Sequence, residues 1–228
     1  MVEGRLLEKR RLAGSVWHLR WEVPSSFQYD PGQFVVVHHT VEGKAWRLPY
    51  SIACPVQPGM IELCVRCMEE GPLAGFPCGL ELGAVLGFEG PFGLFVPRHP
   101  ERDALFVAQG TGIGPIRSIV QDLLRRGSEA QLTLLVGARD EASILYRKEW
   151  EALERNEPHF HFLPTLSQPS GSWTGRRGYV QQHLPEFFPQ RELAVYMCGS
   201  PQMVEEVRSQ FTAAGFDGHQ LIYERYGE

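Results

Sequence analysis

The sequence predicts two domains: an N-terminal antiparallel β-barrel over residues 1–98, followed by an α/β domain with a doubly wound parallel sheet over residues 99–228. Three observations predict this fold. Apolar residues mostly recur with period two over residues 16–96, which is typical of half-buried strands. After about residue 98, apolar strands alternate with amphipathic helices, which implies a parallel sheet. A chain of 228 residues is also long enough for two compact cores.

Two segments of the N-terminal half show the alternation most clearly. The apolar members of the first are Trp17, Leu19, Trp21 and Val23, and those of the second are Ile61, Leu63, Val65 and Cys67. The turn-forming segments "YDPGQ", "QPGM", "EEGP" and "GFEGPFG" interrupt this half at short intervals. Short strands with frequent turns favour a small antiparallel barrel over a mixed sheet.

The C-terminal half follows "RHPERD" (98–103), which we expect to join the two domains. "ALFVA" (104–108) predicts a buried strand. The helix predicted after it has apolar residues spaced three and four apart, namely Ile116, Ile119, Val120, Leu123 and Leu124. Pro115 suits the first turn of this helix, where its missing N–H costs nothing, and Gly127 suits its C-terminal end.

Two further strands are predicted at "LTLLV" (132–136) and "AVYM" (194–197). The second leads into a helix with Ser200 as N-cap and Pro201 at its first position, running to about Ala214. Strands that alternate with helices in this way form a doubly wound sheet, whose ligands bind at the carboxyl ends of the strands.

Composition excludes several classes of function. The formal net charge of -5 gives no general attraction to nucleic acid or anionic membrane. The charged start "MVEGRLLEKRRLAG" lacks the features of a signal peptide, and no stretch approaches the roughly 18 apolar residues of a membrane span. We therefore expect a cytoplasmic protein with neither a nucleic-acid nor a membrane partner.

The cysteines predict neither a disulfide framework nor a metal centre. Five of them, an odd number, occur in a chain expected to be intracellular. Cys64 and Cys67 form a CxxC, but on a strand their thiols point to opposite faces. His159 and His161 share a strand face without a third ligand in view. We expect no metal site.

Two glycine-containing turns carry the first sign of chemistry. "QGTGIGP" (109–115) and "CGSP" (198–201) each follow a predicted strand and open a helix. Glycines there let backbone N–H groups approach a phosphate at the positive end of a helix, and both turns should open on the same crevice. The spacing is not G-x-G-x-x-G, and such a turn also serves as a tight strand-to-helix connection. Cys198 alone is more typical of a small buried residue than of a reactive thiol.

A larger set of motifs, in this order, resembles the ferredoxin–NADP reductase family, which includes flavin reductases and the reductase components of oxygenases. The resemblance covers nearly the whole chain. Its motifs here are "PGQF" (31–34), "LPYSIA" (48–53) beside the pattern R-x-Y-S-[IL]-A, "LCVR" (63–66), "GPLA" (71–74) beside G-x-x-[ST], "GPFG" (90–93), "GTGIGP" (110–115), "CGSPQM" (198–203) and a terminal E-x-[YF] (224–226). The resemblance implies an FAD-binding barrel, a nicotinamide-nucleotide domain and a flavin between them.

The resemblance also implies roles for individual residues. Tyr50 would pack on one face of the flavin ring, and Ser51 would hydrogen-bond near its N5 atom. Tyr226 would cover the other face and move aside when the nicotinamide stacks there. Cys198 and Glu224 would line the nicotinamide site. The predicted catalytic residues are Ser51, Cys198, Glu224 and Tyr226.

The residues predicted to hold FAD or NAD(P)H form a longer set. They are Arg47, Tyr50, Ser51, Ile52, Cys64, Val65, Arg66, Gly71, Leu73, Ala74, Gly110, Thr111, Gly112, Gly114, Pro115, Arg139, Cys198, Gly199, Pro201, Met203 and Tyr226. FAD is favoured over FMN because "GPLAGF" (71–76) resembles the turn whose N–H groups hold the second phosphate.

The chain departs from the family pattern at three places. Leu48 stands where the pattern has arginine, and Arg47 is one residue off, which on a strand reverses its face unless a bulge intervenes. We expect Arg66 to supply the missing phosphate contact, with Arg47 as the alternative. Ala74 replaces a hydroxyl residue. Gly227 and Glu228 extend past the aromatic residue that ends plant-type members.

The predicted activity is hydride transfer from NAD(P)H, as substrate, to bound FAD, which then passes electrons to an acceptor such as a ferredoxin or an oxygenase component. The preference between NADH and NADPH stays open, because Arg139, Arg176 and Arg177 suit a 2′-phosphate whereas Asp140 suits a ribose diol. Two alternatives remain: a subunit that binds a nucleotide or transfers electrons with weak or no flavin binding, and an ordinary Rossmann dehydrogenase.

Overall fold

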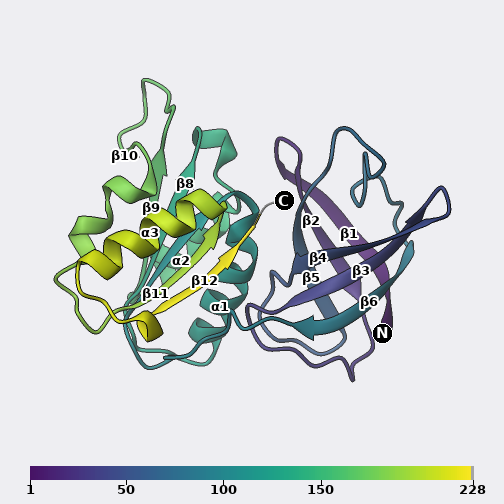
Figure 1. Cartoon of the computed structure of the whole chain (residues 1–228), viewed down its shortest axis with the longest axis horizontal. Helices are drawn as coiled ribbons and strands as arrows, with labels where there is room; N and C mark the ends of the chain where they lie inside the picture. The colour runs from purple at the N-terminus through teal and green to yellow at the C-terminus, as the bar shows by residue number, and fades with distance from the viewer. Residues whose placement is uncertain (227–228) are drawn as a thin grey trace.

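The computed structural model describes residues 1–226 as two bodies side by side, with the C-terminal strand running toward the boundary between them (Figure 1). Gly227 and Glu228, at which we expected a departure from the family, lie outside the described residues. The β-barrel and the doubly wound sheet predicted from the sequence are confirmed.

The N-terminal body is a six-stranded sheet in which neighbouring strands run antiparallel, in the order β4-β3-β6-β1-β2-β5. A bridge between Ile52 and Leu63 brings the end of β4 against β5, so the sheet curls toward a barrel. Its core includes Leu19, Trp21 and Phe88. The strands are β1 Val2–Ala13, β2 Val16–Glu22, β3 Phe34–Val41, β4 Lys44–Ser51, β5 Met60–Arg66 and β6 Val85–Phe92.

The C-terminal body is a six-stranded parallel sheet in the order β10-β9-β8-β7-β11-β12. The strands are β7 Ala104–Gln109, β8 Leu132–Ala138, β9 Phe160–Leu166, β10 Arg176–Arg177, β11 Ala194–Gly199 and β12 Leu221–Arg225. The helices are α1 Ile113–Arg125, α2 Arg147–Asn156 and α3 Pro201–Ala213. Because β7 lies centrally and the chain winds both ways from it, the turns after β7 and β11 open side by side.

The helices cover both faces of this sheet. Apolar residues of α1 and α2 pack in one cluster, and those of α3 pack in another. The α1 cluster also includes Val16, Ala53 and Cys64 of the barrel, so this helix forms much of the domain boundary (Figure 1). β6 ends at Phe92 and β7 begins at Ala104, on either side of the predicted junction.

The local signals for the helices behave as expected. Pro115 lies in the first turn of α1, and the hydroxyl of Ser200 accepts a hydrogen bond from the Met203 N–H at 3.3 Å. The expectation that the cysteines form no disulfide was wrong: Cys67 and Cys78 are joined, with Cα atoms 6.0 Å apart. Composition cannot reveal such a pair, because the fold alone brings the two positions together.

Candidate active site

Three side chains from different domains meet where the barrel faces the parallel sheet. Ser51 ends β4 and is 8% exposed, Glu224 lies on β12, and Tyr226 directly follows β12. The Ser51 hydroxyl donates to Glu224 Oε1 at 2.9 Å, and the Tyr226 hydroxyl donates to Ser51 Oγ. The backbone N–H of Tyr226 donates to Gly199 O at 2.7 Å, which fixes the residue beside β11. The structure thus joins three of the four predicted catalytic residues directly.

Cys198, the fourth, lies on β11 opposite Glu224 of β12 in the parallel register and is fully buried. Burial raises the pKa of the Cys198 thiol well above its ordinary value, and the nearby Glu224 carboxylate acts in the same direction. Burial also raises the pKa of Glu224. Both groups therefore keep their protons to higher pH than exposed groups do.

The two glycine turns approach each other as the sequence predicts. A Cβ atom added to Gly112 would lie 2.3 Å from the Cys198 carbonyl oxygen, so only glycine fits there. A Cβ on Gly114 would meet Cys64 Cβ at 3.4 Å, which shows that the start of α1 abuts the barrel. Ser200 Oγ donates to Gln109 Oε1 at 2.8 Å and ties the two turns together.

A cavity of about 520 Å³ opens beside these turns and crosses the domain boundary. Among the residues that line it, Gly110, Arg139 and Met203 come from the α/β domain and Arg66 from the end of β5. A Cβ on Gly110 would lie 3.7 Å from Arg66 Nη2. The predicted phosphate turn and a predicted cation therefore face one cavity that is large enough for part of a nucleotide.

Tyr50, Leu48 and Trp46 lie on one face of β4, against the barrel core or half-buried beside it. Burial raises the pKa of Tyr50 to about 12. Arg47 lies on the other face, where its Nη2 donates to Glu89 Oε2 at 2.7 Å. The β3–β4 pairing continues from Ser51 to Lys44 without a register shift. The expectation that Arg47 points away from Tyr50 is confirmed.

The turn predicted to hold a second phosphate lies in the loop between β5 and β6. Gly71 has φ +85, a conformation that favours glycine, and Leu73 is buried. Phe76 stacks on His39 of β3 with ring centroids 4.0 Å apart. His39 is paired with Trp46 across the strands, so the loop covers the same face of the β3–β4 hairpin that carries Tyr50.

This face can accommodate a flavin nucleotide. Trp46 Nε1 is buried and has no hydrogen-bond partner among residues 1–226, so it is a donor without an acceptor. Tyr50 offers an aromatic ring and Ser51 a hydroxyl at the domain boundary. Because the Tyr226 hydroxyl contacts Ser51 directly, a flavin ring placed between these two residues requires the Tyr226 side chain to swing aside.

The remaining predicted residues are distributed as follows. Thr111 and Pro115 lie in the turn and first helical turn after β7, Gly199 ends β11, and Pro201 begins α3. Ile52 and Val65 are in the barrel core, and Ala74 is in the loop with Gly71 and Leu73.

The charged residues considered for a 2′-phosphate differ in how they are engaged. Arg139 lines the cavity and its Nε donates to Gln168 Oε1 at 2.9 Å. Arg176 pairs with Glu186, and Asp140 accepts a hydrogen bond from the Ser143 N–H at 2.9 Å. The ion pair of Arg176 and the capping role of Asp140 leave Arg139 as the charge that faces the cavity among these three.

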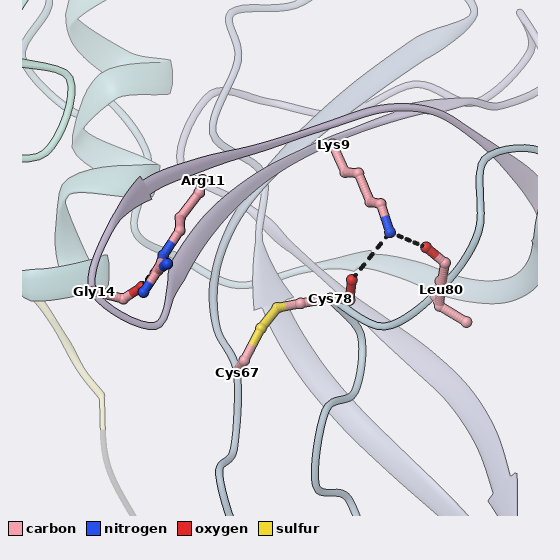
Figure 2. Close-up of a disulfide and its surroundings, with 6 residues drawn as sticks. All are labelled: Lys9, Arg11, Gly14, Cys67, Cys78 and Leu80. Atoms are coloured by element: carbon pink, nitrogen blue, oxygen red, sulfur yellow. Dashed lines mark hydrogen bonds between the residues drawn. A yellow bond between two sulfur atoms is a disulfide. The ribbon is translucent and has the colours of Figure 1, made fainter.

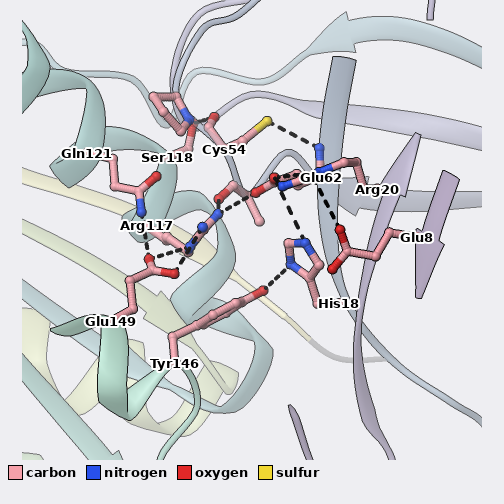
Figure 3. A network of polar contacts seen from close by, with 12 residues as sticks. Glu8, His18, Arg20, Cys54, Glu62, Arg117, Ser118, Gln121, Tyr146 and Glu149 are labelled. Atoms are coloured by element: carbon pink, nitrogen blue, oxygen red, sulfur yellow. Dashed lines mark hydrogen bonds and ion pairs between the residues drawn. The ribbon is translucent and has the colours of Figure 1, made fainter. Parts of the chain in front are cut away.

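Sequence reasoning missed a buried ionic network at the domain boundary (Figure 3). Arg117 of α1 donates through Nη1 to Glu62 Oε2 of β5 at 2.7 Å and through Nε to Glu149 Oε1 of α2 at 2.6 Å. Burial opposes the charge of Arg117, but its hydrogen bond to Glu149 and the neighbouring carboxylates raise its pKa. Its signal is weak in one sequence, since an arginine between Ile116 and Ser118 resembles any surface position of a helix.

The network continues into the barrel through His18 and Tyr146. His18 Nδ1 lies 3.2 Å from the Tyr146 hydroxyl, and the Arg117 guanidinium lies 4.8 Å from the centre of the Tyr146 ring. Burial lowers the pKa of His18 to about 4, although Glu62 acts in the opposite direction. Glu62 also binds Arg20 at 2.9 Å, so a single carboxylate connects both domains.

Comparison with known proteins assigns both halves of the chain. The family model described as "Oxidoreductase FAD-binding domain" matches residues 3–96, and that described as "Oxidoreductase NAD-binding domain" matches residues 106–209. Ferredoxin--NADP reductase B of Sorangium cellulosum is 40% identical over 220 residues, which cover 90% of this chain and 89% of the relative.

Other relatives are longer. The phenol hydroxylase P5 protein of Acinetobacter pittii is 28% identical and matches 98% of this chain but 65% of its own length. The xylene/toluene monooxygenase electron transfer component of Pseudomonas putida is 29% identical and matches 96% of this chain and 63% of its own. This chain thus spans less than two thirds of both.

Solved structures share the fold. A cytochrome P450 reductase from Amycolatopsis has a TM-score of 0.88 at 24% identity, over 98% of this chain and 69% of that one. The FAD/NAD-binding domain of a nitric oxide dioxygenase from Vibrio cholerae has a TM-score of 0.89 at 19% identity, over 100% of this chain and 99% of that one.

Proposed function

Because this chain belongs to the ferredoxin–NADP reductase family, we propose that it moves a hydride from NAD(P)H to bound FAD and passes the electrons to an acceptor protein. One observation carries the proposal. The 2.9 Å hydrogen bond from Ser51 to Glu224 joins the FAD-binding domain to the NAD-binding domain, at the point where a flavin and a nicotinamide must meet.

FAD, when bound, would supply the hydride-accepting and electron-releasing chemistry, and this chain's residues would orient it. Tyr50 supports one face of the ring, and Ser51 offers its hydroxyl near the reacting edge. The side chain of Tyr226 swings away from Ser51 to make room for the flavin and the nicotinamide, while its backbone stays on Gly199. Cys198 fills the space beneath the nicotinamide as a neutral thiol, because burial keeps its proton in place.

Glu224 is the proposed proton-holding group of this site. Burial raises its pKa, and the Ser51 hydroxyl is hydrogen-bonded to its Oε1. A carboxyl group in this position holds or releases a proton next to the reacting edge without exposing it to water.

The cavity between the domains is the proposed site for the rest of the nicotinamide nucleotide. Gly110 offers backbone N–H groups, and Arg66 offers the nearest cation for the pyrophosphate. This placement favours a role for Arg66 in binding NAD(P)H rather than in replacing the family arginine at FAD. Arg139 lines the same cavity and is the proposed contact for the ribose or its 2′-phosphate.

The acceptor is proposed to be a protein, either ferredoxin-like or an oxygenase component. Support comes from the relatives, whose names include a ferredoxin--NADP reductase and electron transfer components of oxygenases.

Residues 1–226 include no helix long and apolar enough to cross a membrane. We propose a cytoplasmic location.

Anaerobic reduction tests the proposed activity. The purified chain is loaded with FAD, and the loss of flavin absorbance is followed in parallel with NADH and NADPH. Heat release of the bound cofactor then identifies it. Bleaching by either nucleotide and release of FAD support the proposal. Release of FMN, or no flavin binding even with excess FAD, contradicts it.

A second function is a subunit that binds nucleotide without turnover of its own. Leu48 favours it, because the face of Tyr50 carries no arginine and Arg47 is engaged with Glu89. The two functions differ in one cheap observation: the reductase is yellow when purified with FAD and is bleached by NAD(P)H, whereas the subunit stays colourless.

A further inference from the structure

A disulfide joins Cys67 and Cys78 (Figure 2), and between them in the sequence lies the turn predicted to bind the second FAD phosphate. Cys67 directly follows β5 and Cys78 lies before β6, eleven positions later in the sequence. The loop that they close, residues 68–77, contains the whole segment "GPLAGF". The disulfide therefore fixes both ends of this turn to each other and, through Cys67, to the end of β5.

Other contacts also hold the second half of the loop, because Phe76 is buried in the barrel core and its N–H donates to Leu73 O at 3.0 Å. Inside it, the Ala74 N–H donates to Gly71 O and the Gly75 N–H donates to Met68 O. Toward the barrel, Phe76 stacks on His39, and Leu73 is buried. Glu69 and Glu70, by contrast, are exposed. Releasing the ends of the loop returns conformational freedom to the part that these contacts do not hold.

FAD binding should depend on this loop more than it does in a chain that carries the arginine of the family pattern. This step rests on the proposed function. On the face of β4 that carries Tyr50, Leu48 occupies the position of the family arginine, while Arg47 on the other face is bound to Glu89. The phosphates of FAD must therefore be held largely by the backbone of the turn, and a disordered turn must first be ordered at the expense of affinity.

We propose that Cys67 and Cys78 form a reversible dithiol–disulfide pair that sets the affinity of this protein for FAD. The reductant is a dithiol. Its first thiolate attacks one sulfur, breaks the Cys67–Cys78 bond and forms a mixed disulfide. Its second thiol then releases the remaining cysteine. Two electrons and two protons pass to the protein, which gains two thiols, and the dithiol becomes a disulfide.

The surroundings of the pair give this exchange a direction. Cys67 is half-buried, whereas Cys78 is 8% exposed, so Cys67 is the more accessible residue of the pair. The Lys9 ammonium donates to Leu80 O at 2.8 Å and lies 3.5 Å from the carbonyl oxygen of Cys78 (Figure 2). The ammonium thus holds the backbone around Cys78 against β1, while Cys67 remains the residue more open to attack.

The test compares the full chain in three states: as the disulfide, after treatment with dithiothreitol, and after reoxidation. Intact mass and alkylation of free thiols establish the state of Cys67 and Cys78. The dissociation constant for FAD is measured by fluorescence in each state. We expect reduction to raise it by about tenfold or more, with about a hundredfold as the limit for a loop of this length. Reoxidation should reverse the change.

A double variant, Cys67→Ser with Cys78→Ser, is the matched control. It should bind FAD like the reduced protein and should not respond to dithiothreitol, which excludes an effect through Cys54, Cys64 or Cys198. Equal FAD affinity in the oxidised and reduced wild-type protein overturns the proposal, as does failure of the two cysteines to pair under oxidising conditions. If the oxidised protein binds no FAD at all, the proposed function fails with it.

Discussion

Replacing Arg117 by Met should destabilise the protein by removing the cation from a buried ion pair and leaving its carboxylate partner behind. Arg117 is bound to Glu62 at 2.7 Å and to Glu149 at 2.6 Å, and the side chains of Arg117 and Glu62 are 9% and 6% exposed. Methionine has a similar length and keeps the apolar contacts, but it leaves the Glu62 carboxylate in a buried site without its nearest partner. An uncompensated buried charge is the costly product of such a change.

The magnitude follows from how much of the network survives. Removing one partner of a buried ion pair costs about 3–5 kcal/mol. Glu62 still holds Arg20 at 2.9 Å, so we expect the lower end, about 3 kcal/mol. For a chain of this length that corresponds to a fall in melting temperature of about 6–12 °C. Because the network joins the two domains, their unfolding transitions should also separate.

Urea unfolding followed by tryptophan fluorescence measures the effect, with two controls. Arg147→Met removes an ion pair whose side chains are 41% and 38% exposed, and should cost about 0–1 kcal/mol. Combining Arg117→Met with Glu62→Gln removes the charge that the single variant strands, so the double variant should recover part of the loss. An Arg117→Met variant as stable as Arg147→Met would refute the reasoning.

The remaining predictions concern the candidate site and its surroundings. Cys198→Ala should slow flavin reduction in stopped-flow experiments far more than it weakens FAD binding, and an unchanged rate would make Cys198 merely structural. Arg66→Ala should weaken NAD(P)H binding by about 1.5–3 kcal/mol, whereas Arg47→Ala should change the binding free energy of NAD(P)H and of FAD by no more than about 0.5 kcal/mol. Titration of both ligands into both variants measures these changes. A greater loss of FAD affinity for Arg47→Ala than for Arg66→Ala contradicts the prediction. The pKa of His18 is about 4 in the folded chain and 6.5 in the unfolded chain, so the unfolded chain binds the proton first as the pH falls. The contribution of His18 to the free energy of unfolding is therefore fully present above about pH 6.5. It falls by about 3 kcal/mol as the pH is lowered to 4. Urea unfolding across this range should show a steeper decline for wild type than for His18→Gln, and parallel curves would exclude the assignment.

The sequence was sufficient for the architecture because local periods identify strands and helices directly. The alternation from Trp17 to Val23 reflects one face that packs in the barrel core, and β2 covers this segment up to Glu22, although His18 on the other face is also buried, at the domain boundary. Ser200 and Pro201 predicted the start of α3, because capping depends only on neighbouring residues. The prediction that Ser51, Glu224 and Tyr226 belong to one site came from the order of motifs that the family shares, and not from local periodicity.

Contacts between distant segments were beyond these local signals. Arg117 and Glu62 are separated by 55 positions, and the residues next to each of them do not indicate that the two form an ion pair. Cys67 and Cys78 lie eleven positions apart, on either side of the turn predicted to bind phosphate, and only the fold brings them together. The odd number of cysteines did not reveal this pair, because the total count cannot show which two cysteines are joined.

The register at Leu48 shows how far a single strand can be interpreted. Period two correctly placed Arg47 on the face away from Tyr50, since β3 and β4 pair without a bulge. The same rule placed Arg66 and Cys64 on one face of β5, but it could not show which part of the molecule that face contacts. In the structure this face turns toward α1 and the cavity, because Cys64 packs in the α1 cluster and Arg66 lies beside Gly110. A cation that faces the cavity between the domains cannot be assigned to FAD from strand parity alone. Since Leu48 offers no charge to a phosphate, we propose that the loop between Cys67 and Cys78, which covers the face of Tyr50, holds the FAD phosphates.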